Sequence, residues 1–402
     1  MSLGRSQSYS LSELEASFLK ENYLLLVAKF EIGKAEAEVV QEKVWENPSF
    51  AVSEVNLWAN GGSEVLSPLF GRYGRTQQIS VELEQLIETA GKRKKRVAIK
   101  RLEHRLAVYD FEELVRELKK ELRQHFHYLA SLKHRHTQLV GMVKLFEQLE
   151  KQYQRQTQQE NVSKADYNRI HNEWLRMQND LTELEVDAES RLSTLRVLTG
   201  INDLEIEKLL VEESFVSRTL LLPKDVTSLL DQNIGIKKRS TEIEMAKQQL
   251  ELEKAQRTPD LTVQLGYDRG GNIMQDFIGL GIQMDLPIFN RNKGNIQRAK
   301  HQIDQANLTR KALQWELEQT VQRYKNQLLK YEEVLNQWSS ETEGGEDMVE
   351  NYRKHLENRH ITLMEFIDYV EAHREARQSF LELWQNYNDR FEELQYLIGK
   401  DF

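Results

Sequence analysis

Two short runs of strictly alternating residues constrain the fold of this chain more than any other feature, because long helical patterns surround them. Leu261 to Asp268 alternates apolar and polar residues, and after a glycine-containing turn the alternation resumes from Ile278 to Leu286. Alternation on both sides of a turn predicts a β-hairpin with one apolar and one polar face. Pro287 ends the second strand, since proline cannot donate a ladder hydrogen bond. A hairpin therefore interrupts a mainly helical chain.

The rest of the sequence is typical of long helices. Charged residues make up 30% of the chain, and this composition with little glycine or proline favours coiled coils. Apolar residues recur at three- and four-residue spacing through residues 86–156 and again in a segment that Ser163 caps and Gly200 ends, which predicts an antiparallel helical hairpin. Further helices are predicted over residues 11–45, 226–257 and 290–338, and a last helix pair turns near 358–362.

The chain reads as one structural plan written twice, about 210 residues apart. Pro48 ends the first helix as Pro259 ends its counterpart, and the helical hairpin ending VLTG (197–200) matches the one ending LIG (397–399). We therefore predict a first repeat over residues 1–223 and a second over 224–402. The first contains strands at about 49–58 and 77–85 and a helical hairpin at about 87–200. The second contains strands at about 260–268 and 276–286 and a hairpin at about 292–399.

Four strands, most with one apolar face, cannot close a barrel by themselves, because closed membrane barrels start at about eight strands. Open sheet edges are not tolerated in lipid and invite aggregation in water. Three chains would together supply about twelve strands, a size compatible with a pore across a bilayer. The alternative is a small soluble sheet packed on helices.

On the barrel interpretation, alternate strand residues face lipid or a watery lumen. The predicted lipid-facing residues are Leu261, Val263, Leu265, Ile278, Leu280, Ile282 and Met284. The predicted lumen-facing residues are Glu82, Glu84, Thr262, Gln264, Asp268, Gln283 and Asp285. Aromatic residues near strand ends are candidates for an interfacial belt, namely Trp58, Tyr73, Tyr267 and Phe277.

The order helix, strand pair, long helical hairpin, present twice, resembles the TolC family of outer-membrane efflux channels over nearly the whole chain. The most specific segment is GLGIQMDLPIFNRNKGNIQRA (279–299), which is similar to the second-repeat signature of that family. Its FNRNKG, with EQLIETAGKRKKR (84–96), is most similar to the heavy-metal branch of cobalt–zinc–cadmium and copper–silver type. Two segments fit the helical tips, NVSKADYNRIHNEW (161–174) and RHITLMEFIDYVEAHR (359–374).

The resemblance implies a mainly α fold with a small β part. It implies a homotrimer whose barrel lies in the outer-membrane lipid of a Gram-negative bacterium and whose helices form a tunnel into the periplasm. The implied function is a passive export duct of a tripartite efflux system, with a periplasmic adaptor (membrane fusion) protein and an inner-membrane RND-type pump, for heavy-metal cations. Neither catalysis nor a cofactor is expected. The alternatives are the same channel serving drug efflux or protein secretion, and a soluble coiled-coil scaffold.

Acidic residues near the start of the last helix ring the periplasmic constriction in related channels. The matching positions are Glu365 and Asp368, with Asp166 at the first-repeat tip. Glu365 and Asp368 share a helix face, and threefold symmetry would turn each into a ring that favours cations. The arginine–tyrosine latch of drug-exporting members is not reproduced, and Arg359 is its nearest substitute. The alternative is that these are solvated coiled-coil positions.

Other functions have weaker support. The formal net charge of −9 argues against nucleic acid as a partner, and the absence of cysteine excludes thiolate metal sites. Two close histidine pairs lie on one predicted helix, His125 with His127 and His134 with His136. Residues two apart on a helix diverge, so this spacing favours a solvated surface over a metal site. No apolar run reaches the roughly 18 residues of a transmembrane helix.

Overall fold

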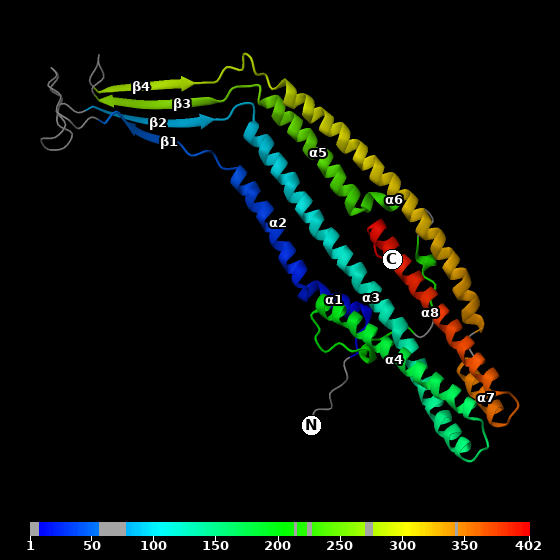
Figure 1. The fold of residues 1–402 in the computed structure, drawn as a ribbon. Helices are drawn as coiled ribbons and strands as arrows, with labels where there is room; N and C mark the ends of the chain where they lie inside the picture. Colours follow the sequence, from blue (N-terminus) through cyan, green and yellow to red (C-terminus); the bar gives the residue numbers. More distant parts are fainter. Residues whose placement is uncertain (1–7, 56–77, 213–214, 223–226, 270–275, 342–344) are drawn as a thin grey trace. The chain divides into compact units, whose positions relative to one another are not determined.

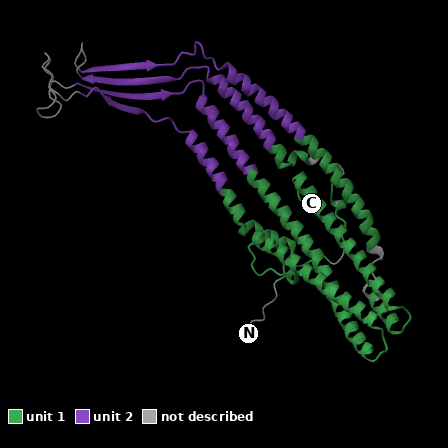
Figure 2. Cartoon of the chain, viewed as in Figure 1, with its two compact units in different colours: residues 1–29, 110–237, 313–402 green, residues 30–109, 238–312 purple. Residues whose placement is uncertain are grey.

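The computed structural model describes residues 8–55, 78–212, 215–222, 227–269, 276–341 and 345–402. Within these ranges helices dominate and one four-stranded sheet is present (Figure 1). The chain forms two compact units (Figure 2): unit 1 contains residues 1–29, 110–237 and 313–402, and unit 2 contains residues 30–109 and 238–312. Each unit draws on both halves of the sequence. The repeats at 1–223 and 224–402 stay a prediction.

The sheet belongs to unit 2 and is antiparallel throughout, in the order β1-β2-β3-β4. Its strands are β1 (Ser49–Ser53), β2 (Ile79–Ile87), β3 (Leu261–Arg269) and β4 (Phe277–Gln283). β2 pairs with β3 along their whole length, from Ile79 opposite Arg269 to Ile87 opposite Leu261. The two strand pairs predicted from the sequence are thus joined into one sheet. Among the described residues, β1 and β4 have no partner on their outer edges.

The last strand is shorter than the span predicted for it. β4 ends at Gln283, which pairs with Thr262, rather than at residue 286. The partner strand begins at Leu261, two residues after Pro259, and the last residue pair of this ladder is Thr262 with Gln283. Met284 and Asp285 therefore follow the strand and do not belong to it. Of the strand predicted at 49–58, residues 56–58 lie outside the described residues, as do Trp58 and Tyr73.

A buried lysine strengthens the connection between the strand pairs. Lys92 begins α3 (Lys92–Gln158), and its Nζ lies 2.7 Å from Asp260 Oδ2, just before β3. The same ammonium donates to the Thr258 carbonyl at 2.8 Å, and the Thr89 N–H donates to Asp260 Oδ1 at 2.8 Å. The side chain of Lys92 is only 4% exposed, so its charge is neutralised where it is buried. The first strand pair is therefore held to the second by polar contacts as well as by the sheet.

Helices build most of both units. They are α1 (Leu11–Glu21), α2 (Tyr23–Glu42), α3, α4 (Lys164–Thr199), α5 (Ile234–Ala255), α6 (Lys293–Glu341), α7 (Gly345–Glu357) and α8 (Leu363–Ile398), with 3₁₀ turns η1 (Ile206–Lys208), η2 (Thr219–Leu221) and η3 (Thr227–Gln232). Ser163 caps α4 as predicted. Gly200 and Gly399 end α4 and α8 in the left-handed conformation, which glycine adopts without strain.

Unit 1 has two apolar cores, and both confirm the predicted helical spacing. In the first, α3 buries Leu118, Leu122, Phe126, Leu129 and Leu132, and α4 buries Ile170, Met177 and Leu184. In the second, α6 buries Leu317, Val321, Leu328 and Leu335 against Trp384, Tyr387, Phe391 and Leu394 of α8. Each core lies between helices that the sequence pattern predicts as neighbours.

The helix predicted over residues 11–45 is broken at Asn22, between α1 and α2. The Asn22 Nδ2 donates to the Leu198 carbonyl at 2.9 Å, and its Oδ1 accepts the Leu25 N–H at 3.1 Å. Asn22 is 2% exposed. Its side chain therefore docks the last turn of α4 and caps α2 at the same time, which replaces the helical hydrogen bonds lost at the break.

The same device recurs in the second half, where the helix predicted over residues 226–257 is broken at Asn233. Its Nδ2 donates to the Leu397 carbonyl at 2.7 Å, and its Oδ1 accepts the Ile236 N–H at 3.0 Å. The glycine after α8 packs against the break, because a Cβ on Gly399 would lie 2.8 Å from the Gln232 carbonyl oxygen. Two equivalent asparagine joints, at Asn22 and Asn233, thus hold the C-terminal ends of α4 and α8.

Candidate functional site

The sheet has one apolar and one polar face. Residues directly opposite one another in an antiparallel pair point to the same face, and the register places Leu83, Leu265 and Leu280 in one such row. Neighbouring rows add Val263 with Ile282, and Tyr267 with Ile278. The β4 members are strongly exposed in the single chain, with Leu280 at 76%. An exposed apolar patch of this kind marks a surface that contacts lipid or protein.

The opposite face carries the polar residues. Glu84, Gln264 and Gly281 form one row, in which Gln264 Nε2 donates to Glu84 Oε1 at 2.6 Å. Gln264 also donates to Gln283 at 3.1 Å. Glu82 lies on the same face, opposite Gly266. The predicted sets therefore separate onto two faces, and which face contacts lipid stays a prediction.

The tips of the two helical hairpins are built alike in unit 1. Glu160 after α3 and Arg359 after α7 both have positive φ, 60° and 61°. Each tip then leads to a hydroxyl cap, Ser163 before α4 and Thr362 before α8. A left-handed residue followed by a cap lets the chain reverse within a few residues. The predicted turn near 358–362 is confirmed.

The predicted gate acids occupy distinct positions at these tips. Glu365 closes a capping box, since its carboxylate accepts the Thr362 N–H at 2.7 Å. The hydrogen bonds from the Thr362 backbone and side chain lower the pKa of Glu365. Asp166 accepts the Ser163 hydroxyl at 2.7 Å. Asp368 and Arg359 are exposed. Two of the four candidates thus stabilise helix starts, and a role of any of them in a pore stays a prediction.

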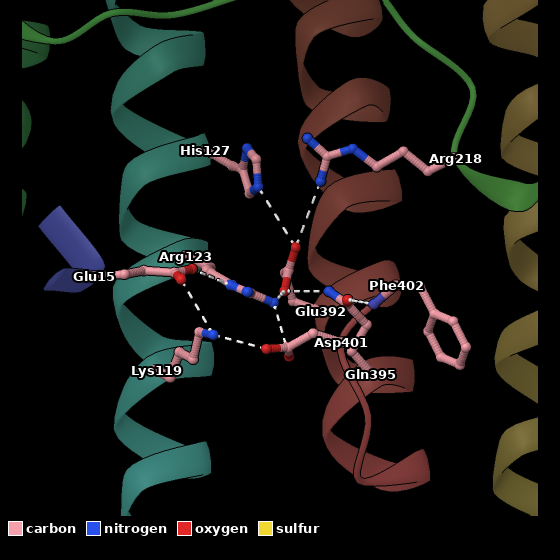
Figure 3. Close-up of polar contacts among 9 residues, drawn as sticks. All are labelled: Glu15, Lys119, Arg123, His127, Arg218, Glu392, Gln395, Asp401 and Phe402. Atoms are coloured by element: carbon pink, nitrogen blue, oxygen red, sulfur yellow. Dashed lines mark hydrogen bonds and ion pairs between the residues drawn. The ribbon is translucent and has the colours of Figure 1, made fainter. Parts of the chain in front are cut away.

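A buried carboxylate that sequence reasoning missed lies deeper in unit 1 (Figure 3). Glu392 of α8 is 3% exposed, and its Oε2 lies 3.0 Å from Arg123 Nη1 of α3. Its Oε1 lies 3.5 Å from Arg218 Nη1 and 3.7 Å from His127 Nε2. Gln395 donates to Oε2 at 2.7 Å. One carboxylate therefore connects α8 to α3 and to the connector that holds Arg218.

Arg123 extends this ionic cluster to two further acids. Its Nε donates to Glu15 Oε1 of α1 at 2.6 Å, and its Nη1 lies 3.3 Å from Asp401 Oδ1. Lys119, one turn earlier on α3, contacts the same two carboxylates at 3.1 and 2.7 Å (Figure 3). Three carboxylates thus balance Lys119, Arg123 and Arg218. A closed network of this kind fixes the relative positions of the helices that contribute to it.

The protonation states follow from the surroundings. Burial disfavours the Glu392 carboxylate, but the neighbouring His127 and the Arg123 charge more than offset this, so the pKa of Glu392 is lowered. Burial lowers the pKa of His127 and keeps its ring neutral. Burial also raises the pKa of Asp389, one turn before Glu392, to about 6. A cavity of about 460 Å³ beside the cluster is lined by His127, Arg123 and Arg218 among others.

Four of the histidines of α3 lie near four different acceptors. His127 faces Glu392 and His125 lies near Glu121. His134 lies near the Glu212 carbonyl, and His136 lies near Glu185. Within the described ranges no three His, Asp or Glu side chains are grouped so that they could hold a metal ion. No described helix combines the length and apolar character needed to cross a membrane.

Comparison with known proteins agrees with this architecture. Residues 226–400 match the family model described as "Outer membrane efflux protein". The cobalt-zinc-cadmium resistance protein CzcC of Cupriavidus metallidurans is 40% identical over 55 residues, which are 14% of this chain and 13% of that protein. The matched segment thus spans only a small part of the curated relative.

Solved channel structures share the fold over almost the whole chain. CusC is 14% identical with a TM-score of 0.78, covering 97% of this chain and 92% of that chain. The outer membrane channel CmeC of Campylobacter jejuni is 16% identical with a TM-score of 0.76, covering 97% and 85%. MtrE of Neisseria gonorrhoeae is 14% identical with a TM-score of 0.73, covering 97% and 89%. At these identities the likeness concerns the fold.

The long helical hairpins and the open, two-faced sheet give this chain the TolC-like channel fold, which confirms the predicted mainly α class with a small β part. Residues 226–400, which are less than half of the chain, are similar to the outer membrane efflux protein family.

Proposed function

We propose that this chain is one protomer of a homotrimeric export duct that crosses the outer membrane and extends into the periplasm. The observation that carries the proposal is the open sheet: both edges lack partners among the described residues, and one face exposes Ile278, Leu280 and Ile282. Copies of the chain that pair edge to edge would satisfy the backbone groups and turn the apolar face to lipid. Three copies would give about twelve strands.

In this proposal the two faces of the sheet have different surroundings. The apolar residues contact lipid, and the polar residues face the lumen, where the Gln264–Glu84 hydrogen bond remains hydrated. The lipid-facing set is Leu261, Val263, Leu265, Ile278, Leu280 and Ile282, with Met284 just beyond the strand. The lumen-facing set is Glu82, Glu84, Gln264, Asp268 and Gln283, with Asp285 just beyond the strand.

The duct would act with a periplasmic adaptor protein and an inner-membrane pump, and its cargo would be heavy-metal cations. The similarity to the cobalt-zinc-cadmium resistance protein CzcC supports this cargo class. No catalytic step is proposed, because conduction needs only a path of suitable width and charge. Drug efflux, protein secretion and a soluble scaffold are the competing functions that experiments should separate.

The decisive experiment is to express the protein with a secretion signal and determine where and in what form it assembles. We expect it to fractionate with outer membranes as a trimer and to conduct ions in planar bilayers. A matched variant, Leu280→Asp, places a charge at the centre of the exposed apolar face and should prevent membrane assembly. A soluble monomer from the unmodified chain would reject the proposal.

The gate acids Glu365, Asp368 and Asp166, with Arg359, are proposed to set selectivity at the periplasmic end. Asp368→Asn removes a charge without touching a helix cap, whereas Glu365→Gln also weakens the capping box. We expect both variants to reduce the cation-to-anion permeability ratio, measured as a reversal potential in a salt gradient. Glu382→Gln on the exposed side of α8 is the control. An unchanged ratio in Asp368→Asn would reject the role of Asp368.

A further inference from the structure

The backbone hydrogen bonds of the turn after α7 bring the side chains of His355 and His360 together. The His360 N–H donates to the His355 carbonyl at 2.8 Å, and the Arg359 N–H donates to the Leu356 carbonyl at 3.0 Å. With Arg359 in the left-handed region at φ 61°, these bonds form a Schellman motif. In this motif the side chains at the two ends of the outer hydrogen bond lie next to each other, and here both are histidine.

The two rings face each other through their nitrogens. His355 Nδ1 lies 3.3 Å from His360 Nδ1, and the ring centroids are 5.5 Å apart at 45°. Both residues are exposed. The equivalent turn after α3 has the same backbone, with the Asn161 N–H donating to the Gln156 carbonyl at 2.9 Å, but carries two amides. The histidine pair therefore belongs to one tip only.

This nitrogen separation suits a metal ion. Two imidazole nitrogens bound to tetrahedral zinc at about 2.0–2.1 Å lie about 3.3–3.4 Å apart. Only one hydrogen bond can form between the two Nδ1 atoms of a histidine pair. Imidazole nitrogens are good ligands for zinc, copper and nickel. Because the Schellman backbone already holds the two rings in place, little ordering is required when an ion binds.

We propose that His355 and His360 form a two-histidine site for a divalent transition-metal cation, with water in the remaining coordination positions. Within the described ranges no group of three His, Asp or Glu side chains is placed to hold an ion, so the protomer supplies only two ligands at this tip. An open site with two protein ligands binds and releases its ion readily, unlike a closed four-ligand site.

The charged neighbours leave the pair accessible. Arg353 forms ion pairs with Glu350 and Glu357 on the same helix. The Arg353 side chain is 27% exposed, and both acids are half-exposed. Two cations are next to the pair in the chain, Lys354 before His355 and Arg359 before His360. The proposal goes beyond export and does not require it, since binding is measured on the purified protein whatever the chain conducts.

Zinc binding by the full-length protein tests the site, with isothermal titration at neutral pH and the metal salt as the only ligand. We expect the wild type to bind one zinc per protomer at this site. His355→Gln or His360→Asn should each weaken the affinity of this site for zinc at least 10-fold. His301→Gln, an exposed histidine on α6, should leave it unchanged. Equal titrations for the wild type and the double variant would overturn the proposal.

A gain of binding gives an independent test that does not depend on losing a ligand. Gln156→His with Asn161→His places histidines at the same two positions of the first tip turn. We expect this variant to bind one further zinc per protomer, and the copper-loaded protein to show nitrogen hyperfine splitting from two imidazoles in its electron paramagnetic resonance spectrum. If the variant gains no zinc although it folds like the wild type, the backbone argument for the site is wrong.

Discussion

Neutralising Glu392 is the sharpest test of what holds unit 1 together. Glu392→Gln keeps the size of the side chain but removes the charge that faces Arg123 at 3.0 Å and Arg218 at 3.5 Å. Removing one partner of a buried ion pair costs about 3–5 kcal/mol. Arg123 keeps Glu15 at 2.6 Å and Asp401 at 3.3 Å, so we expect the lower end, about 3 kcal/mol. Arg218 loses its most buried partner.

Thermal unfolding of the purified protein at pH 7.5, followed by circular dichroism, measures this effect. At about 2–4 °C per kcal/mol for a unit of this size, the midpoint should fall by about 6–12 °C. Glu382→Gln on the exposed side of α8 should shift it by less than about 2 °C. Adding Arg123→Gln to Glu392→Gln should cost less than the sum of the two changes, because the partners are in contact. A shift no larger than that of the control, or strict additivity, would refute the reasoning.

Three further predictions follow from individual contacts. Burial raises the pKa of Asp389 to about 6. The folded state therefore keeps this proton to a higher pH than the unfolded state does, so the free energy of unfolding falls as pH rises from about 4 to 6. Asp389→Asn should raise the unfolding midpoint at pH 8 and leave it unchanged at pH 4. Asn233→Ala removes the hydrogen bonds to Leu397 and α5 and should lower the free energy of unfolding by about 2 kcal/mol. The control Asn307→Ala loses only a local bond within α6 and should lower it by under about 0.5 kcal/mol. Equal losses of stability in denaturant titrations would contradict this. Thr262→Asp, on the polar face of the sheet, should still assemble in outer membranes, and its failure there would exclude a watery lumen.

The helical part of the fold was predictable because periodicity is a local property of the sequence. Leu122 and Phe126 repeat at the spacing of one helix face, and both are buried in the core that this spacing predicts. The strands were predictable for the same reason, since alternation assigns Leu265 and Gln264 to opposite faces before any partner is known. The end of β4 was not, because it depends on where the neighbouring strand starts.

The contacts that could not be predicted join residues far apart in the sequence. Arg123 and Glu392 stand in helices crowded with charges, most of which are solvated, and no local pattern distinguishes a buried charge from an exposed one. The break at Asn22 was missed because an asparagine within a helical pattern usually costs little. What decides the break is the Leu198 carbonyl, which is supplied by another helix.

The likeness of the two halves, finally, lies in their backbone hydrogen bonds more than in their charges. The asparagine joints and the tip turns recur in both halves with the same hydrogen bonds. By contrast, Glu392 stands seven residues before Gly399, and the corresponding position before Gly200 is Ser193. In the proposed trimer the scaffold would therefore repeat about six times around the axis, while the ionic cluster and the histidine pair would occur three times. The two halves thus share their backbone joints and differ in their charges, so variants at shared joints should act on stability, and variants at unshared charges should act on function or on one half alone.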